Sequence, residues 1–330
     1  AMVPAAASLS YGYIYSSPRV YALASPGVTM LWSGVIVAFS RVVRGRWGRL
    51  CVVTVIAGTV LGQNVAFLQK QGELTRMLGG VYGRVLDVAS DGAEGSAGFV
   101  NLPTYVAHRE KTYAMILESV LFIPPYSDLV EFCWVNGVAP VDAVVYSPVV
   151  EDGGYVRGLR GGGLDWEEMR HFAAEHESVW LSRWRDQRLV LDHVGAIDAN
   201  AAPSRGDPLV TFEGGPAIEA ASGEGARGSH WVLTIDWAAS GPVDSRMFVH
   251  VRDAQGELVG QADGPALGGM VPTWIWREGD RIRDVRHVSL EGRPPYTLQV
   301  GLFNAEGRLP AYQAGSRCPD DVCSVVDFGP

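Results

Sequence analysis

Two uncharged runs decide the predicted fold: VYALASPGVTMLWSGVIVAFS at residues 20–40 and LCVVTVIAGTVLGQNVAFLQ at residues 50–69. Each run is close to the roughly 20 apolar residues that cross a bilayer as a helix. Between them RVVRGRWGR, residues 41–49, holds four arginines. Short loops rich in arginine stay on the cytoplasmic side. The sequence therefore predicts a transmembrane helical hairpin over residues 1–71, with all later residues outside the cytoplasm.

The alternative is a helical hairpin buried inside a soluble protein. A helix on the surface of a soluble protein needs a polar stripe, and neither run shows one. We therefore favour a multi-pass protein of the cell membrane, with the lipid bilayer as a partner. The chain opens with Ala1-Met2-Val3-Pro4 and no basic leader, so we expect it to be the C-terminal part of a longer membrane protein.

Charge is distributed unevenly along the chain. The net charge is −9, yet the first 70 residues hold six of the 27 basic residues and no acidic one. The remaining residues carry 21 basic against 36 acidic side chains, a net of −15. Nucleic-acid binding needs a basic surface that replaces the counterions of the phosphates. An acidic body without such a surface excludes nucleic acid as a partner.

Residues 72–199 are predicted to form a small extracytoplasmic α/β domain led by an amphipathic helix. From Leu74 to Leu86, apolar residues recur at helical spacing with charged residues between them. Strand-like and helix-like segments then alternate, which is typical of a small, partly parallel sheet. We expect strands at 99–103, 120–124, 141–147, 179–182 and 188–192, and helices at 128–136 and 164–176.

Three acidic residues, Asp165, Glu167 and Glu168, open the second of these helices. They fit either a carboxylate site or the ordinary preference for acids in the first turn of a helix. We favour the helix-terminal role, because the electrostatics of the helix already explain it.

Residues 200–330 are predicted to form an all-β sandwich of the immunoglobulin or jelly-roll kind. A linker rich in Ala, Pro, Ser and Gly precedes this region, and short alternating runs separated by turns then follow one another. The expected strands are 208–212, 231–237, 246–252, 257–263, 281–289, 296–303 and 322–328. With the hairpin and the α/β domain, the whole chain is predicted to be multidomain.

Four aspartates in the predicted turns of the sandwich form the sharpest polar set. Oxygen ligands gathered on loops are typical of a calcium site or a sugar-binding rim. Turn formation and hydrogen bonding at strand ends explain aspartates in turns equally well, and we favour that explanation. The four are Asp253, Asp263, Asp280 and Asp284.

Four tryptophans have the shape to stack on sugar rings. Trp231 and Trp237 share the parity of one predicted strand, which suits packing in a core. Trp274 and Trp276 follow Val271-Pro272-Thr273 in a predicted loop and are the better ligand candidates. The predicted glycan-binding residues are Trp274, Trp276, Asp263 and Asp253, and no metal ligands are assigned.

Two cysteines, Cys318 and Cys323, bracket a four-residue turn near the C-terminus. In an extracytoplasmic domain they fit a local disulfide. Two free thiols are the alternative, because spacing alone does not fix the geometry that a bridge requires.

Several motifs within residues 205–315 resemble one known pattern. They are WVLTIDW (231–237), FVHVRD (248–253), GQADGP (260–265), PTWIW (272–276), YTLQVGLF (296–303) and RLP (308–310). Together they resemble the β-sandwich at the C-terminus of bacterial polytopic glycosyltransferases of the GT-C class, which are similar to polyprenyl-phosphate-sugar-dependent mannosyltransferases. SPRVY at 17–21 resembles, more weakly, the start of a late membrane helix of such proteins.

The resemblance implies a transferase for the full-length protein and an extracytoplasmic place for these domains. Enzymes of this class are expected to use an acidic residue in an early loop, whereas the first acidic residue here is Glu73. No catalytic residue of the family is therefore carried over, and we expect this portion to be catalytically silent. We predict no cofactor for it, and a divalent cation only as an option for the full-length protein.

We therefore predict a non-catalytic part of a membrane glycosyltransferase-like protein that transfers sugar from a polyprenyl-phosphate donor. Its expected role is to bind a glycan or protein acceptor or to support the catalytic spans. The alternative is a membrane-anchored module that binds carbohydrate or protein and has no enzymatic activity. Fold-level analogy alone links the chain to sugars at this point.

Overall fold

The computed structural model describes most of the chain after residue 45. The described residues are 33–38, 41–43, 45–91, 96–109, 119–121, 129–146, 155–185, 188–199, 201, 206–227, 229–292 and 294–329. They belong to two compact units, one within residues 1–78, 105–122 and 154–157, the other within 79–104, 123–153 and 158–330.

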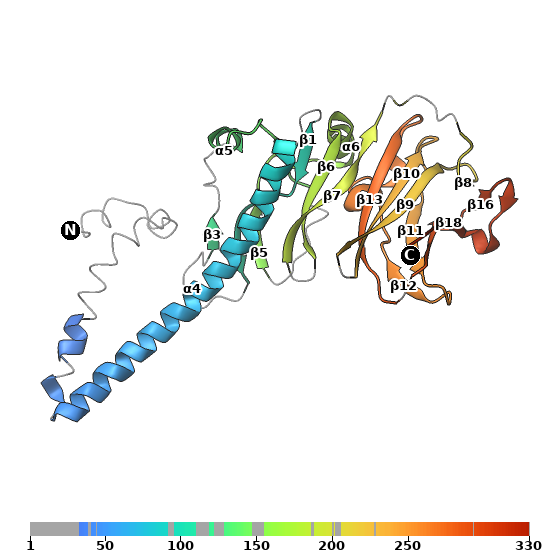
Figure 1. The fold of residues 1–330 in the computed structure, drawn as a ribbon. Coiled ribbons are helices and arrows are strands. Elements are labelled where there is room, and N and C mark those ends of the chain that lie inside the picture. Colours follow the sequence, from blue (N-terminus) through green and yellow to red (C-terminus); the bar gives the residue numbers. More distant parts are fainter. Residues whose placement is uncertain are drawn as a thin grey trace. The chain divides into compact units, whose positions relative to one another are not determined.

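The first unit contains most of one long helix and a small sheet (Figure 1). Helix α4 runs without a break over Arg46–Asp91, and its last residues belong to the second unit. The small sheet has the order β3-β2-β5, from Ser119–Leu121, Pro103–His108 and Tyr155–Leu159.

The prediction of a two-helix transmembrane hairpin is wrong. Within the part of the chain that the structure describes, no helix combines the length and the apolarity needed to cross a membrane. Of the first predicted span, only residues 33–38 are described. The second run is the first half of α4. That run lacks charge, but Thr54, Thr59, Gln63 and Asn64 interrupt its apolar character. A segment without charge is therefore not apolar enough, on that ground alone, to span a bilayer.

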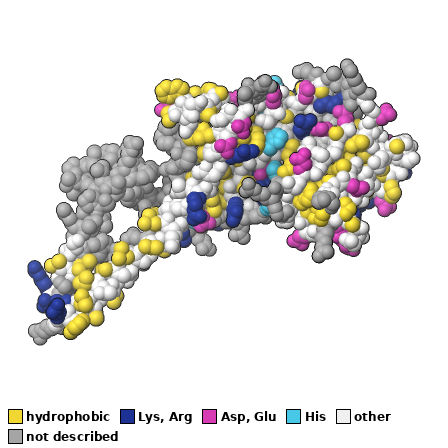
Figure 2. Space-filling view, in the orientation of Figure 1, with side chains coloured by type: hydrophobic (Ala, Val, Ile, Leu, Met, Phe, Trp, Pro, Cys, Tyr) yellow, Lys and Arg dark blue, Asp and Glu magenta, His cyan; other side chains and the backbone are white. Residues whose placement is uncertain are grey.

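Helix α4 nevertheless exposes apolar side chains along its first half, next to the arginines at its start (Figure 2). Leu50, Val55, Leu61 and Leu68 are among the exposed ones. Further along, the helix becomes one-sided as predicted from residue 74 onward, because Leu74, Leu78, Val81, Tyr82 and Val85 are buried.

The second unit is built mainly from two sheets. The larger has ten strands in the order β17-β16-β8-β9-β10-β13-β7-β6-β1-β4. Its bounds are β1 Ala97–Val100, β4 Asp142–Val144, β6 Ser178–Arg185, β7 Arg188–Asp198, β8 Val210–Phe212, β9 Ala217–Arg227, β10 His230–Ala238, β13 Arg281–Ser289, β16 Ala311–Gln313 and β17 Ser316–Arg317. Strand β1 is parallel to both β4 and β6, and the remaining pairs with a stated register are antiparallel.

The smaller sheet of this unit contains β12, β11, β14 and β15, and β18 also pairs with β14, on the edge that does not face β11. These strands are Leu258–Gln261, Arg246–Arg252, Tyr296–Asn304, Gly307–Arg308 and Cys323–Phe328. Short helices complete the unit: α5 Leu129–Val135, α6 Trp166–Glu175, α7 Ala266–Gly269, η2 Thr273–Ile275 and η3 Pro319–Asp321.

Side chains from both sheets form one buried cluster, so this unit is mostly β-sheet with a shared core, consistent with a sandwich. The core alternation on β10 is as predicted, with Leu233, Ile235 and Trp237 buried. The α/β layer is not separate from the sandwich, however. Gly195–Asp198 of β7 pairs with Arg281–Asp284 of β13, so one sheet continues through both predicted regions.

Helix α6 begins as predicted. The Asp165 side chain accepts a hydrogen bond from the Glu168 backbone N–H at 2.9 Å, and the Glu168 carboxylate accepts one from the Asp165 N–H at 2.9 Å. This reciprocal pair is a capping box. The helix-terminal role of these acids is confirmed, and two of the three are occupied by it.

Candidate functional site

A pocket of about 360 Å³ lies at one end of β11 and is the candidate site. It contains two residues singled out from the sequence, Trp274 and Asp263, which are only eleven positions apart but lie on different loops. Its walls come from the start of β11, the loop after β12, the loop that leads into η2 and the end of β14. The lining residues are Ser245, Arg246, Met247, Asp263, Gly264, Pro265, Pro272, Thr273, Trp274 and Phe303.

Trp274 is the exposed aromatic side of this pocket. It is the middle residue of η2, which begins directly after Pro272, and 44% of its surface is exposed. Its ring makes a T-shaped contact with that of Trp166, with ring centroids 5.6 Å apart, and Trp166 makes the same kind of contact with Tyr146 at 5.2 Å. Edge-to-face contacts hold rings in a fixed orientation, so one face of Trp274 is presented by a supported ring.

Arg246 and Phe303 form a second wall. They are direct cross-strand neighbours in the antiparallel pair of β11 and β14, so both side chains lie on the same side of the sheet. Phe303 is 36% exposed, and its ring centroid lies 6.4 Å from that of the buried Phe248. A second aromatic surface therefore flanks the pocket, with a guanidinium beside it.

Asp263 forms the third wall. Its Oδ1 accepts a hydrogen bond from the Val249 backbone N–H at 2.8 Å, and the His250 Nε2 lies 3.5 Å from the same atom. His250 in turn contacts Gln261 at 3.1 Å. The carboxylate is therefore oriented through one oxygen, while the side chain remains about half exposed.

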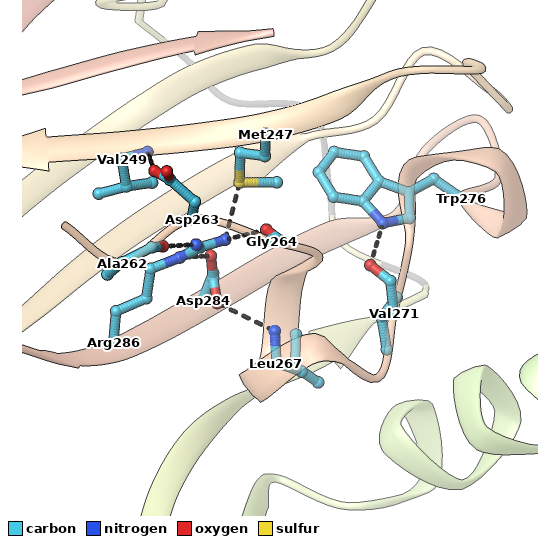
Figure 3. Close-up of polar contacts among 10 residues, drawn as sticks. All are labelled: Met247, Val249, Ala262, Asp263, Gly264, Leu267, Val271, Trp276, Asp284 and Arg286. Atoms are coloured by element: carbon cyan, nitrogen blue, oxygen red, sulfur yellow. Dashed lines mark hydrogen bonds and ion pairs between the residues drawn. The ribbon is translucent and has the colours of Figure 1, made fainter. Parts of the chain in front are cut away.

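A buried ion pair fixes the loop that carries Asp263, as Figure 3 shows. Arg286 Nε lies 2.6 Å from Asp284 Oδ2, and both side chains are buried. The guanidinium also donates to the carbonyl oxygens of Ala262 and Gly264, on either side of Asp263. A charged donor that bonds carbonyls in a buried setting holds the backbone strongly. Arg286 thus positions Asp263 without touching it.

The same network holds the next turn. Asp284 Oδ1 accepts a hydrogen bond from the Leu267 N–H at 2.9 Å, and Arg286 Nη2 lies 2.8 Å from the Met247 sulfur (Figure 3). Because Met247 lines the pocket, the ion pair joins the floor on β11 to the loop that covers it.

A hydrogen-bonded pair closes the floor between β11 and the Trp274 loop. The Thr273 hydroxyl donates to the Ser245 carbonyl at 2.7 Å, and the two hydroxyls lie 3.2 Å apart. Both residues are buried. The Trp274 loop is therefore tied to the strand that carries Arg246.

Trp276, the other predicted loop tryptophan, is buried rather than presented to a ligand. Its indole N–H donates to the Val271 carbonyl at 3.1 Å (Figure 3), and its ring packs against Trp237 with centroids 5.7 Å apart. It anchors the base of the loop that presents Trp274. Trp231 packs against Tyr296 and Phe328, so Trp231 and Trp237 are packing residues, as favoured from the sequence.

The other predicted aspartates do not join the pocket. Asp253 accepts hydrogen bonds from the N–H groups of Gln255 and Glu257, each at 3.0 Å, which closes its turn. Asp280 accepts one from Arg170 Nε at 3.0 Å, and Asp284 serves Arg286. Among the described residues, no group of three or more His, Cys, Asp or Glu is placed to hold a metal ion.

Cys318 and Cys323 are joined by a disulfide, with Cα atoms 5.3 Å apart. The bridge encloses η3 and leads into β18, which is an edge partner of β14. It fixes the last part of the chain onto the sheet that carries the pocket.

A larger hollow of about 720 Å³ lies elsewhere in the second unit, beside the C-terminus of α6. Both arginines that line it are paired with carboxylates: Arg281 lies 3.0 Å from Glu219, and Arg283 lies 2.9 Å from Asp236. We place the candidate site in the smaller pocket because only there do supported aromatic faces and polar groups converge.

Sequence reasoning missed Arg246, Phe303, Ser245 and Thr273. Arg246 and Phe303 stand at opposite ends of two predicted strands, and only the register of β11 against β14 brings them together. A weak signal was present, because a large aromatic residue at the exposed end of a strand is unusual for pure packing. Ser245 and Thr273 carry no such signal.

The side chains of this pocket are suited to bind a small polar ring without covalent bonds. Aromatic faces at Trp274 and Phe303 offer stacking surfaces, Asp263 accepts hydrogen bonds from hydroxyl groups, and Arg246 donates them. Searches of known protein families and of curated protein sequences found no match for this chain, so no family membership is shown.

Proposed function

We propose that this chain is the extracytoplasmic, non-catalytic part of a membrane glycosyltransferase-like protein that uses a polyprenyl-phosphate sugar, and that it binds glycan at the pocket around Trp274. The observation that carries the glycan-binding proposal is one pocket with two exposed aromatic faces and a half-exposed carboxylate. Sugars have apolar ring faces and polar rims, and this combination complements both.

Rigidity supports binding as the role of the pocket. The Asp263 loop is held by Arg286, and the Trp274 loop by Ser245 and by Trp276. Side chains on preorganised loops lose little conformational entropy when a ligand binds, and affinity benefits directly.

The carboxylates of the pocket favour binding over glycoside hydrolysis. Glycosidases typically use a pair of carboxyl groups on either side of the scissile bond. Among the described residues that line the pocket, Asp263 is the one carboxylate, and one of its oxygens is already bonded to a backbone N–H. A pocket with this single carboxylate is therefore better suited to bind a glycan than to cleave one.

The disulfide supports the extracytoplasmic part of the proposal. Disulfides persist in oxidising compartments and are rare in the cytosol. The bridge between Cys318 and Cys323 lies in the same unit as the pocket. The resemblance of residues 205–315 to the sandwich of GT-C-class proteins supports the link to glycosyl transfer.

Titration of the purified chain with neutral oligosaccharides built from mannose, glucose or galactose, followed by calorimetry, tests the proposal. We expect binding, and we expect Trp274→Ala to weaken it at least tenfold because a stacking surface is lost. The free energy of unfolding should change by less than about 1 kcal/mol, because Trp274 is half exposed.

Trp134→Ala is the matched control. Trp134 is a tryptophan of the same unit, lies on α5 outside the pocket and is 78% exposed. Its replacement should leave the affinity unchanged. Equal affinities of the wild-type chain and Trp274→Ala, or no binding to any neutral or acidic sugar, would contradict the proposal.

A further inference from the structure

We propose that the glycan bound at this pocket is acidic, and that Arg246 recognises its anionic group. This inference rests on the proposed function and deepens it, because it names the chemical class of the ligand. The anionic group is a carboxylate or a phosphate carried on the sugar ring, since a guanidinium binds both through the same pair of donors.

The first observation is that the Arg246 guanidinium is uncommitted. Among the described residues, no hydrogen bond or ion pair involves this side chain, although it lines the pocket. The next arginine on β11 differs: Arg252 donates to Gln299 and to the Gly256 carbonyl, each at 2.7 Å. An arginine with five free donors at a pocket wall is available to a ligand.

The second observation is that the pocket has opposite charges at separate places. Asp263 is bonded to the backbone N–H of Val249, three residues along β11 from Arg246. Three residues of an extended strand span about 10 Å. Among the described residues no ion pair joins the two side chains, so the guanidinium and the carboxylate stay available to separate groups of one ligand.

The third observation concerns the tolerance of Asp263 for an acidic ligand. One oxygen of Asp263 accepts the Val249 N–H, and the His250 ring lies 3.5 Å from it. This oxygen of Asp263 is therefore already engaged by the protein. Ring hydroxyl groups can donate to its other oxygen while the anionic group of the same ligand binds Arg246.

Phe303 makes the Arg246 wall selective for a ring that bears the charge. It is the direct cross-strand neighbour of Arg246, and its side chain is partly exposed in the same pocket. An anion bonded to Arg246 therefore has an aromatic surface beside it. A free inorganic anion satisfies the guanidinium but leaves the surfaces of Phe303 and Trp274 uncovered.

Calorimetry of the full chain with two matched pairs of probes tests the inference: methyl mannoside against methyl mannoside 6-phosphate, and methyl glucoside against methyl glucuronide. We expect at least one acidic probe to bind about tenfold more tightly than its neutral counterpart, as a charge-assisted hydrogen-bond pair provides. The advantage should shrink as the salt concentration rises. Tighter binding of the phosphate or of the carboxylate probe identifies the source of the charge.

Arg246→Gln should reduce the advantage of the acidic probe to about twofold while leaving the neutral mannoside bound, and Arg246→Lys should restore part of it. Arg188→Gln is the control for net charge, because Arg188 is exposed and lies at the start of β7, outside the pocket. It should change nothing.

The outcomes separate this inference from the proposed function. Equal binding of neutral and acidic probes, with the dependence on Trp274 intact, overturns the acidic-ligand inference alone. An acidic preference that survives Arg246→Gln overturns the assignment to Arg246. The absence of binding for all probes overturns both proposals.

Discussion

The two hollows of the second unit differ in size and in whether the arginines that line them are paired. The hollow beside α6 is twice as large, about 720 against 360 Å³, yet its two arginines are paired with Glu219 and Asp236. In the smaller pocket the ion pair lies behind the wall, and Arg246 on the wall itself is free of partners among the described residues. An arginine that is already paired with a carboxylate has fewer donors to offer a ligand than an arginine without a protein partner.

The largest effect should distinguish the ion pairs of the two hollows. Asp284→Ala leaves the buried Arg286 without its partner, and we expect a loss of about 3–5 kcal/mol in the free energy of unfolding. Asp236→Ala removes the partner of Arg283, which is 63% exposed, and should cost less than about 1 kcal/mol. Denaturant unfolding measures both.

Both substitutions leave an arginine of β13 unpaired, so each is the control for the other. If Asp284→Ala does not fold, Asp284→Asn keeps the shape and an acceptor for the Leu267 N–H, and its cost should still exceed that of Asp236→Asn. Equal costs in the two hollows would show that the ion pair behind the small pocket is not its main support.

An intermediate effect concerns pH and the arginines of the larger hollow. Burial, together with the electrostatic effects of His287 and Arg283, lowers the pKa of His193 from 6.5 to about 4. The unfolded chain then binds a proton at a pH where the folded chain does not. Stability should therefore be complete above pH 6.5 and fall by about 3 kcal/mol as the pH decreases to 4.

Unfolding curves recorded between pH 7 and pH 4 measure this loss. His193→Gln should flatten the dependence, although His287, whose pKa burial also lowers, retains part of it. Arg283→Gln should reduce the loss slightly, because one of the charges that lower the pKa of His193 is gone. A dependence that is unchanged in His193→Gln would assign the acid sensitivity to other groups.

The smallest expected effect on stability comes from a change in the backbone of the small pocket, at Gly264. Gly264 has φ of +114°, and a Cβ there would meet no atom within 4 Å, so Gly264→Ala introduces strain without a clash. We expect a cost of about 1–2 kcal/mol and weaker glycan binding. Gly162→Ala is the control, because Gly162 has ordinary φ and open space, and it should be neutral or slightly stabilising.

Much of the second unit could be predicted from residue patterns. The alternation of apolar and polar residues gave β11 and β13 with their observed bounds, and acidic residues at 165–168 gave the start of α6. Local chemistry determines these features. Strand β9, Ala217–Arg227, was missed, since its Ala, Ser and Gly residues carry no strand pattern.

Pairing between distant segments could not be predicted. Nothing local indicates that β7 joins β13, and this pairing makes one sheet of what looked like an α/β layer and a sandwich. The candidate site depends on the same kind of information. Trp274 and Trp276 are equivalent in the sequence, but the core receives Trp276 and the pocket receives Trp274. The prediction of a transmembrane hairpin was wrong for a different reason, because absence of charge is a weaker signal of a membrane span than sustained apolarity.

The pairing of β7 with β13 also constrains the order in which the chain can fold. Strand β7 is synthesised long before β13, and until β13 arrives its edge presents unpaired backbone groups. The earlier half of the sheet therefore cannot be completed as it leaves the ribosome. Folding of this unit has to wait for a contact that is distant in sequence, which is slow and leaves a strand edge open to other chains in the meantime.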